Sequence, residues 1–322
     1  MKKVILFVLV LFISCNHKSN SFEIENYFKF NELKNKNSVN FNIKYDLSLV
    51  SEFDIINDSI IFIIENKNDY ILKFYDFVND SMISQTFGVG NGPNEVIQFN
   101  FLQYPKFYNN YFYYVNPFIS QLNEFIIRSD YSLEINDQKS LSHKGQMFPI
   151  TNFCFINRNL VTTGFSSTLQ DYNYEIIILE KGNKEIQKRI SRMDKEESVK
   201  PLDFYINYAS LIESNNNYII QSYYHKNEIK IVDINSDYNY TTIQGKEENI
   251  RSKKYKYYDD LSITDDNRVF LLREAERVIY EFDIPNRTGE IIKLKDAGNI
   301  INTHNNKLYI LNINDNNITV YD

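Results

Sequence analysis

The chain has 322 residues, of which 43% are hydrophobic, 15% aromatic and 24% charged, and its formal net charge is −7. A negative chain is a poor partner for nucleic acid or for an anionic membrane surface, so neither is expected as the main ligand. A chain of about 300 residues can bury most of its apolar surface in a core without disulfides.

The N-terminus reads as a leader rather than as part of the fold. Two lysines precede an apolar run over residues 4–13, and Ser14 stands immediately before Cys15. The run is too short to span a bilayer, which needs about 20 residues. We therefore predict a lipoprotein signal peptide over residues 1–14 with acylation at Cys15. The alternative is an ordinary secretory signal cleaved nearby.

Residues 15–37 are polar and rich in Asn, Lys and Ser, and we assign them to a lipidated tether, with a short ordered piece expected around Phe22 to Phe30. Two or more acyl chains hold a protein stably on a membrane. The expected location is the envelope of a Gram-negative bacterium, at the outer membrane, on either its periplasmic or its surface face. Membrane contact is expected through the lipid anchor only.

The rest of the chain reads as strands, because runs rich in Ile, Val, Tyr and Phe alternate with Asn, Asp, Gly and Lys clusters. These runs fall into similar groups along the sequence. The third strands of successive groups are expected to end 52, 52, 53, 50 and 39 residues apart, at Asp76, Arg128, Glu180, Asp233, Asp283 and Asp322. Four strands in such a period are typical of one β-propeller blade.

The spacing predicts an all-β fold over residues 38–322, a six-bladed β-propeller of four-stranded antiparallel blades. The last unit lacks an outer strand, and an unpartnered strand at about 38–47 precedes the first, so we expect the two to pair and close the ring. Strands such as Ser59–Ile64 are almost continuously apolar, as expected where both faces are covered. The alternative is a pair of β-sandwich domains.

A glycine-rich stretch follows the first group of strands and contains Gly88, Gly90, Gly92, Pro93 and Glu95. No helix and no Lys-Ser/Thr pair follow it, so a phosphate-binding loop is not favoured over a tight turn between blades. In this motif the sequence resembles the TolB-like six-bladed β-propeller lipoproteins. The resemblance implies the fold and the envelope location, and it implies no catalytic residues.

Reaction motifs are weak. The histidines are scattered without metal-ligand spacing, and no Gly-x-Ser-x-Gly is present. Cys154 lies between two phenylalanines in an apolar strand, where a buried structural thiol is favoured over a nucleophile. We expect no catalytic residues, no metal and no cofactor.

A binding surface is expected on the loops that join second and third strands and on one crossing between blades. Aromatic side chains beside a few polar groups suit sugars or peptides. The candidate residues are Asn116, Phe165, Tyr223, Tyr224, His225, Lys254, Arg273 and Glu274. Separately, Ser59 and Ser81 stand in Asp-Ser-Ile and Asp-Ser-Met, which resemble a short O-glycosylation sequon and are equally turns before strands.

The leading hypothesis is a lipid-anchored, monomeric and non-catalytic propeller that binds a protein or glycan in the cell envelope. One alternative is a propeller enzyme, a glycan or peptide hydrolase or lyase that uses carboxylates gathered at the mouth of the central channel. The other alternative is a purely structural scaffold.

Overall fold

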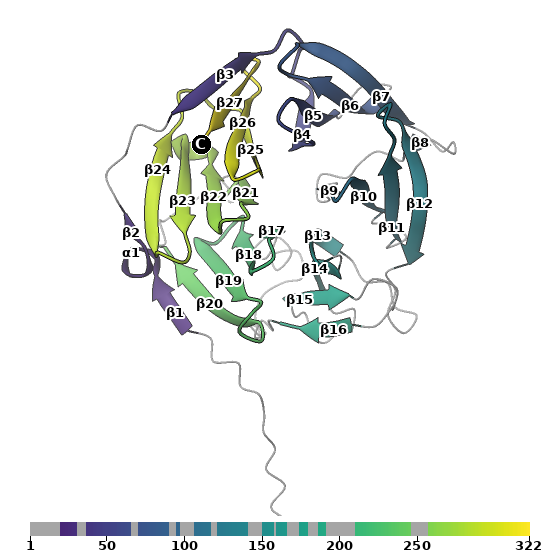
Figure 1. Cartoon of the computed structure of the whole chain (residues 1–322). Helices are drawn as coiled ribbons and strands as arrows, with labels where there is room; N and C mark the ends of the chain where they lie inside the picture. The colour runs from purple at the N-terminus through teal and green to yellow at the C-terminus, as the bar shows by residue number, and fades with distance from the viewer. Residues whose placement is uncertain are drawn as a thin grey trace, which may run out of the picture.

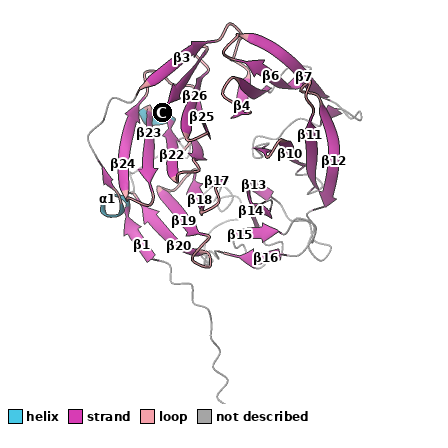
Figure 2. Cartoon of the chain, viewed as in Figure 1, coloured by secondary structure: helices cyan, strands magenta, loops and turns pink. Residues whose placement is uncertain are grey.

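The protein is described by a computed structural model that covers residues 20–30, 37–65, 70–89, 95–96, 106–116, 121–140, 150–157, 159–165, 174–179, 186–190, 210–245 and 257–322. Most of these residues lie in strands (Figure 2). The helical turns among them are α1 (Ile24–Tyr27) and the 3-10 turn Glu274–Glu276. No helix in the described part of the chain is long and apolar enough to cross a membrane.

The chain is an all-β propeller of small, mostly antiparallel sheets set around a common centre (Figure 1). The described residues form six sheets, numbered here in chain order by their innermost strands. The first sheet contains β4 (Val50–Ile55), β5 (Ile60–Glu65), β6 (Tyr70–Asp76), β7 (Ser81–Val89) and β8 (Glu95–Val96).

The second and third sheets follow the same inner-to-outer order. The second contains β9 (Lys106–Tyr108), β10 (Tyr111–Asn116), β11 (Gln121–Ile127) and β12 (Leu133–Ser140). The third contains β13 (Ile150–Ile156), β14 (Asn159–Phe165), β15 (Tyr174–Leu179) and β16 (Ile186–Arg189).

The last three sheets each include a strand from the N-terminal part of the chain. The fourth contains β17 (Ser210–Ser214), β18 (Tyr218–Tyr223), β19 (Glu228–Asp233), β20 (Asn239–Gln244) and β1 (Asn20–Glu23). The fifth contains β21 (Asp260–Ile263), β22 (Arg268–Arg273), β23 (Val278–Asp283), β24 (Thr288–Lys293) and β2 (Lys29–Phe30). The sixth contains β25 (Asn299–His304), β26 (Lys307–Asn312), β27 (Asn317–Tyr321) and β3 (Ser38–Asn42).

The strand spacing expected from the sequence is confirmed. The third strands β6, β19 and β23 end at the predicted Asp76, Asp233 and Asp283. The other three, β11, β15 and β27, end one residue before the predicted positions. The strand ends could be predicted because Asn and Asp favour turns, and a strand of a hairpin ends where the turn begins.

The hydrophobic core lies between sheets rather than at a single centre. Phe62 of the first sheet packs on Phe112 of the second, with ring centroids 5.7 Å apart. Phe41 and Phe77 join the sixth and first sheets in the same way, at 5.0 Å. Since neighbouring sheets cover both faces of β5, every residue of that strand is buried, as its apolar sequence predicts.

Residues 20–30, here called the strap, lie against the outer edges of the fourth and fifth sheets. Strand β1 pairs with β20, and β2 pairs with β24, both in parallel. Phe28 is 1% exposed and its ring lies 4.5 Å from that of Phe282. The short ordered piece expected in the tether is therefore present, and it is packed into the core shared by two sheets.

The residues of the glycine-rich turn are partly covered by the structure. Gly88 lies in β7 and pairs with Glu95 of the short parallel strand β8. Gly90, Gly92 and Pro93 lie outside the described residues. Ser59 donates hydrogen bonds from its N–H and its hydroxyl to Asn57 Oδ1, both at 3.0 Å, and Ser81 is exposed at the start of β7.

Candidate functional site

The predicted loop residues on the fourth sheet are mostly buried. Tyr223 is 1% exposed and Tyr224 6%, whereas His225 is half-buried. The backbone carbonyl of Tyr224 accepts a hydrogen bond from the N–H of Tyr257 at 2.6 Å. These two tyrosines thus contribute to the core more than to an open surface.

The predicted loop residues on the fifth sheet are also engaged in contacts. Arg273 forms an ion pair with Glu276 at 3.0 Å, and its guanidinium lies 5.4 Å from the ring of Tyr257. The Glu274 carboxylate accepts hydrogen bonds from the N–H groups of Gly298 and Asn299, at 3.1 and 2.7 Å. Glu274 therefore holds the start of the sixth sheet.

Of the remaining predicted residues, some lie in the described part of the chain and some do not. Asn116 and Phe165 are the last residues of β10 and β14. Cys15 and Lys254 lie outside the described residues. Of the predicted residues, Tyr224 and Arg273 both contact Tyr257, which was not among the candidates, and the other predicted contacts stay predictions. Cys154 is buried and unpaired, and burial raises the pKa of its thiol, as expected of a structural cysteine.

Titratable groups converge on the innermost strands, around the central channel. They are Asp54 on β4, Lys106 on β9, Glu213 on β17 and Asp260 on β21. Lys106 forms an ion pair with Glu213, which joins the second sheet to the fourth. Burial raises the pKa of Asp54 to about 6, and it also raises the pKa of Asp260 and of Glu213 above the usual range.

The two channel aspartates hold neighbouring sheets together. Asp54 Oδ2 accepts a hydrogen bond from the N–H of Phe107 at 3.2 Å, and Asp54 Oδ1 accepts one from Asn302 Nδ2 at 3.1 Å. Asp260 Oδ2 accepts one from the N–H of Ile301 at 2.8 Å. A carboxylate that accepts several N–H groups is a well-satisfied buried acceptor, so both side chains have a structural role.

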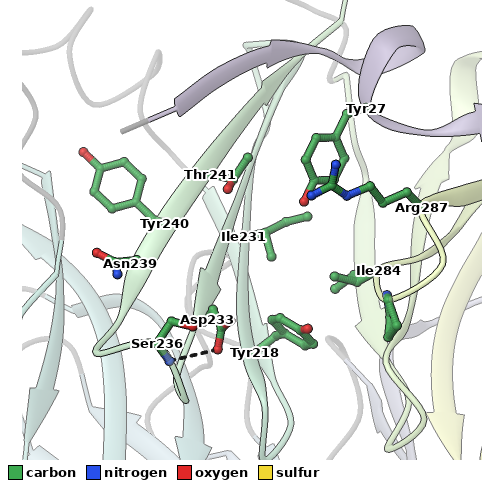
Figure 3. Close-up of a pocket in the computed structure, with 11 residues that line it drawn as sticks. Tyr27, Tyr218, Ile231, Asp233, Ser236, Asn239, Tyr240, Thr241, Ile284 and Arg287 are labelled. Carbon is green, nitrogen blue, oxygen red and sulfur yellow. Dashed lines mark hydrogen bonds between the residues drawn. The ribbon is translucent and has the colours of Figure 1, made fainter. Parts of the chain in front are cut away.

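An open groove lies between the fourth and fifth sheets, below the strap (Figure 3). Its volume is about 680 Å³. The strap, strands β18, β19 and β20 with the β19–β20 turn, and the β23–β24 turn supply the described part of its lining. The residues are Tyr27, Tyr218, Ile231, Asp233, Ser236, Asn239, Tyr240, Thr241, Ile284, Pro285 and Arg287. The groove is therefore at the end of the sheets opposite to the predicted loops, because it lies beside the hairpins that join third and fourth strands.

The polar side chains of the groove are held in place by local contacts. Asp233 Oδ1 accepts hydrogen bonds from the N–H groups of Asn235 and Ser236, at 2.9 and 3.2 Å, and its Oδ2 accepts one from Ser236 Oγ at 2.8 Å. The Arg287 guanidinium lies 4.9 Å from the ring of Tyr27. These contacts fix a carboxylate and a guanidinium on opposite walls.

The aromatic side chains of the groove differ in orientation. Figure 3 shows Tyr27 beside Arg287 at the strap and Tyr218 on the far side of the groove, whereas the Tyr240 ring points away from both. Burial, and then the nearby Asp233 carboxylate, raise the pKa of the Tyr218 hydroxyl. Tyr27 and Tyr218 are thus the two rings that bracket the space.

A smaller cleft of about 320 Å³ lies between the outer strands of the fifth and sixth sheets, where Tyr321 and Lys293 contribute to its wall. In the part of the chain that the structure describes, no group of three or more His, Cys, Asp or Glu side chains could hold a metal ion.

Comparisons with known proteins place this chain by its fold. No protein-family model matches the sequence, and no curated protein matches it. A catalytically inactive virginiamycin B lyase from Staphylococcus aureus is similar in structure, with a TM-score of 0.56 and 8% identity over 88% of this chain and 98% of that chain. A protein of unknown function from Bacteroides thetaiotaomicron gives a TM-score of 0.54 and 8% identity over 94% of this chain and 74% of that one. At such identities the similarity shows a shared propeller fold.

Sequence reasoning did not identify the groove. Asp233 is the last residue of β19 and Arg287 immediately precedes β24, and nothing in their local sequence distinguishes them from other residues at turns. One signal was present in the strap, where Phe22, Tyr27, Phe28 and Phe30 interrupt an otherwise polar segment. Such a cluster predicts docking, although it does not say where the segment docks.

Proposed function

We propose that this protein is a lipid-anchored propeller of the bacterial cell envelope that binds a glycan or protein partner without changing it chemically. The observation that carries the proposal is the open groove between the fourth and fifth sheets, where an aspartate and an arginine are held in place on opposite walls. Fixed polar groups beside aromatic rings are typical of binding sites.

We propose further that the propeller has six blades, one for each sheet, and that β3 closes the ring. The antiparallel pairing of β3 with β27 and the packing of Phe41 on Phe77 support this assignment. The alternative is a ring of five blades. The likeness to TolB-like lipoproteins stays a hypothesis that rests on the glycine-rich turn.

The anchor belongs to the same proposal. Acylation at Cys15 would attach the chain five residues before β1, so the strap would lie close to the membrane. Metabolic labelling with an alkyne fatty acid, followed by membrane fractionation, tests this assignment. We expect the label and membrane retention in the wild type and neither in Cys15→Ala. Equal labelling of both proteins would exclude Cys15 as the site.

Binding is tested by affinity capture from the native envelope, with the anchored wild type compared with Arg287→Gln. Arg287 is exposed, so its replacement should leave the fold intact. We expect a specific partner or glycan with the wild type and a reduced yield with the variant. If the yield falls in Lys254→Glu or His225→Ala and not in Arg287→Gln, the binding site lies on the predicted loops instead.

A second candidate function is catalysis at the channel, as a hydrolase or lyase. The raised pKa of Asp54 and of Asp260, close to Lys106 and Glu213, favours it, because a protonated carboxyl group can act as a general acid. The hydrogen bonds that both aspartates accept from neighbouring sheets argue for the structural role instead. Product formation from envelope glycans or peptides that is lost in Asp54→Asn would establish the enzyme. A protein with neither bound partner nor product would be a scaffold.

A further inference from the structure

The groove below the strap has the chemistry of a site for a polar, uncharged ligand. Among the described residues that line it, the charged ones are Asp233 and Arg287, whose formal charges cancel. A cleft with one dominant sign of charge would attract ions of the other sign, and this groove has none. Neither an anionic nor a cationic ligand is therefore favoured.

The hydrogen-bonding groups of the groove suit a ligand with many hydroxyls. Asp233 already accepts three hydrogen bonds from its own turn, and an ionised carboxylate has about four acceptor positions, so one remains for a ligand. The Tyr218 hydroxyl and the Thr241 hydroxyl can each donate and accept. Arg287 presents donors in a fixed plane, because its guanidinium is held against Tyr27.

The rings of the groove suit a ligand that is apolar on its faces and polar at its rim. Tyr27 contacts Phe22 and Phe28, with centroids 5.5 and 4.9 Å apart, so its orientation is fixed by the strap. Tyr218 stands across the space from it (Figure 3). A pyranose ring combines C–H faces with equatorial hydroxyls, which matches a site with aromatic walls and polar corners.

An extended peptide fits this region less well. Peptides commonly bind at a sheet by adding a strand to an open edge. Here the edge strands β20 and β24 are already paired with β1 and β2 of the strap. The strap thus occupies part of each edge that a peptide strand would need, from Thr241 to Gln244 on β20 and at Thr288 and Gly289 on β24.

We propose that the groove between the fourth and fifth sheets binds a neutral oligosaccharide between Tyr27 and Tyr218, with Asp233 and Arg287 bonded to its hydroxyls. This inference deepens the proposed function, on which it rests, by assigning the site and the ligand class. The strap is part of the site, because it supplies Tyr27 and fixes Arg287.

The test uses the complete mature chain and isothermal titration calorimetry. The neutral probes are maltoheptaose, cellohexaose and the hexamer of N-acetylglucosamine, and the charged probes are oligogalacturonate and the glucosamine hexamer. We expect at least one neutral probe to bind and the charged probes to bind at least tenfold more weakly. Arg287→Gln and Tyr218→Ala should each weaken binding about tenfold, because each removes a direct ligand contact.

The matched control is Tyr321→Ala, which removes a half-buried tyrosine from the wall of the smaller cleft and should change affinity less than twofold. Circular dichroism checks the fold of each variant. Since Arg287 is exposed, Arg287→Gln keeps the test valid even if Tyr218→Ala unfolds.

The proposal is overturned if no neutral probe binds at 1 mM, if charged probes bind more tightly, or if both groove variants bind as the wild type does. Absence of oligosaccharide binding together with capture of an envelope protein would overturn this inference and leave the proposed binding function intact. Binding followed by cleavage of the probe would support the site and refute the non-catalytic function.

Discussion

At the scale of single residues, the buried charged side chains of the first sheet are matched with partners. Glu65 and Lys73 lie in the first sheet with their side chains 0% and 7% exposed, and Lys73 Nζ is 2.7 Å from Glu65 Oε2. Tyr45 completes the cluster, because its hydroxyl donates a hydrogen bond to Glu65 Oε1. A charge taken out of water in this way is stable only while its partner remains.

Loss of the lysine should therefore be costly. We expect Lys73→Met to lower the free energy of unfolding by roughly 3–5 kcal/mol, because it leaves a buried carboxylate uncompensated. Urea denaturation monitored by fluorescence measures the change. The control is Lys44→Met, since Lys44 forms a 2.8 Å ion pair with Asp80 but is 90% exposed. Similar losses for both variants would refute the importance of burial.

The channel aspartate Asp54 predicts a pH dependence of stability. Burial raises its pKa from 3.8 to about 6 in the folded state, so the folded protein binds this proton more tightly than the unfolded chain does. The contribution of Asp54 to the free energy of unfolding is therefore fully present below about pH 4 and is lost as the pH rises through about 6. In Asp54→Asn that loss should be missing.

Denaturation of both proteins at pH 4.5, 6 and 7.5 checks this prediction. The stability of Asp54→Asn relative to the wild type should increase with pH. A difference between the two proteins that stays constant or falls as the pH rises would contradict a raised pKa for Asp54. Because other carboxylates titrate in the same range, the comparison of two proteins is more informative than one profile.

At the scale of elements, the strap is the unusual feature. It adds parallel strands to the edges of two neighbouring sheets, and these edges would otherwise present unpaired backbone groups. Phe30 packs so closely over Gly289 that a Cβ there would lie 2.8 Å from the ring. The glycine therefore permits the fifth sheet to accept β2.

We expect Phe28→Ala to lower the free energy of unfolding by about 3–5 kcal/mol, because it removes a fully buried ring from the core shared by the fourth and fifth sheets. Phe22→Ala serves as the control, since Phe22 is 40% exposed. Chemical denaturation and amide hydrogen exchange of β20 and β24 provide the measurement. Equal effects of the two substitutions would mean that the strap is not docked in solution.

Elements of this kind were only partly predictable. The strand ends followed from local sequence, since β-branched and aromatic runs end at Asn and Asp turns. The local sequence did not predict the sheet edges with which β1 and β2 pair, because their partners Thr241 and Thr288 lie more than two hundred residues away. Pairing over such separations depends on the assembled sheets.

At the scale of the whole molecule, β3 near the start of the chain pairs with β27 near its end. Ile43 follows this strand, is 4% exposed, and donates its N–H to the carbonyl of Asn316 at 2.8 Å. It packs in the cluster that connects the sixth and first sheets. If this contact holds the ring together, its loss should weaken the whole propeller.

Accordingly, Ile43→Ala should lower the free energy of unfolding by about 2–5 kcal/mol and preserve a single cooperative transition. Val39→Ala is the control, because Val39 lies in the same strand and is 58% exposed. Differential scanning calorimetry measures both. A separate early transition in Ile43→Ala, with the rest unchanged, would show that the N-terminal strand contributes only locally.

The sequence by itself determined the propeller class, because strand length, turn composition and a period near fifty residues are local properties that each unit repeats. It also predicted the buried thiol of Cys154 and the ordered piece of the strap. Which polar residues meet was decided only by the tertiary structure. Asp54 lies beside Asn302 because the first and sixth sheets are neighbours, and Tyr27 lies beside Arg287 because the strap docks on the fifth sheet. Contacts of this kind depend on the assembled fold, so composition and spacing could not predict the groove.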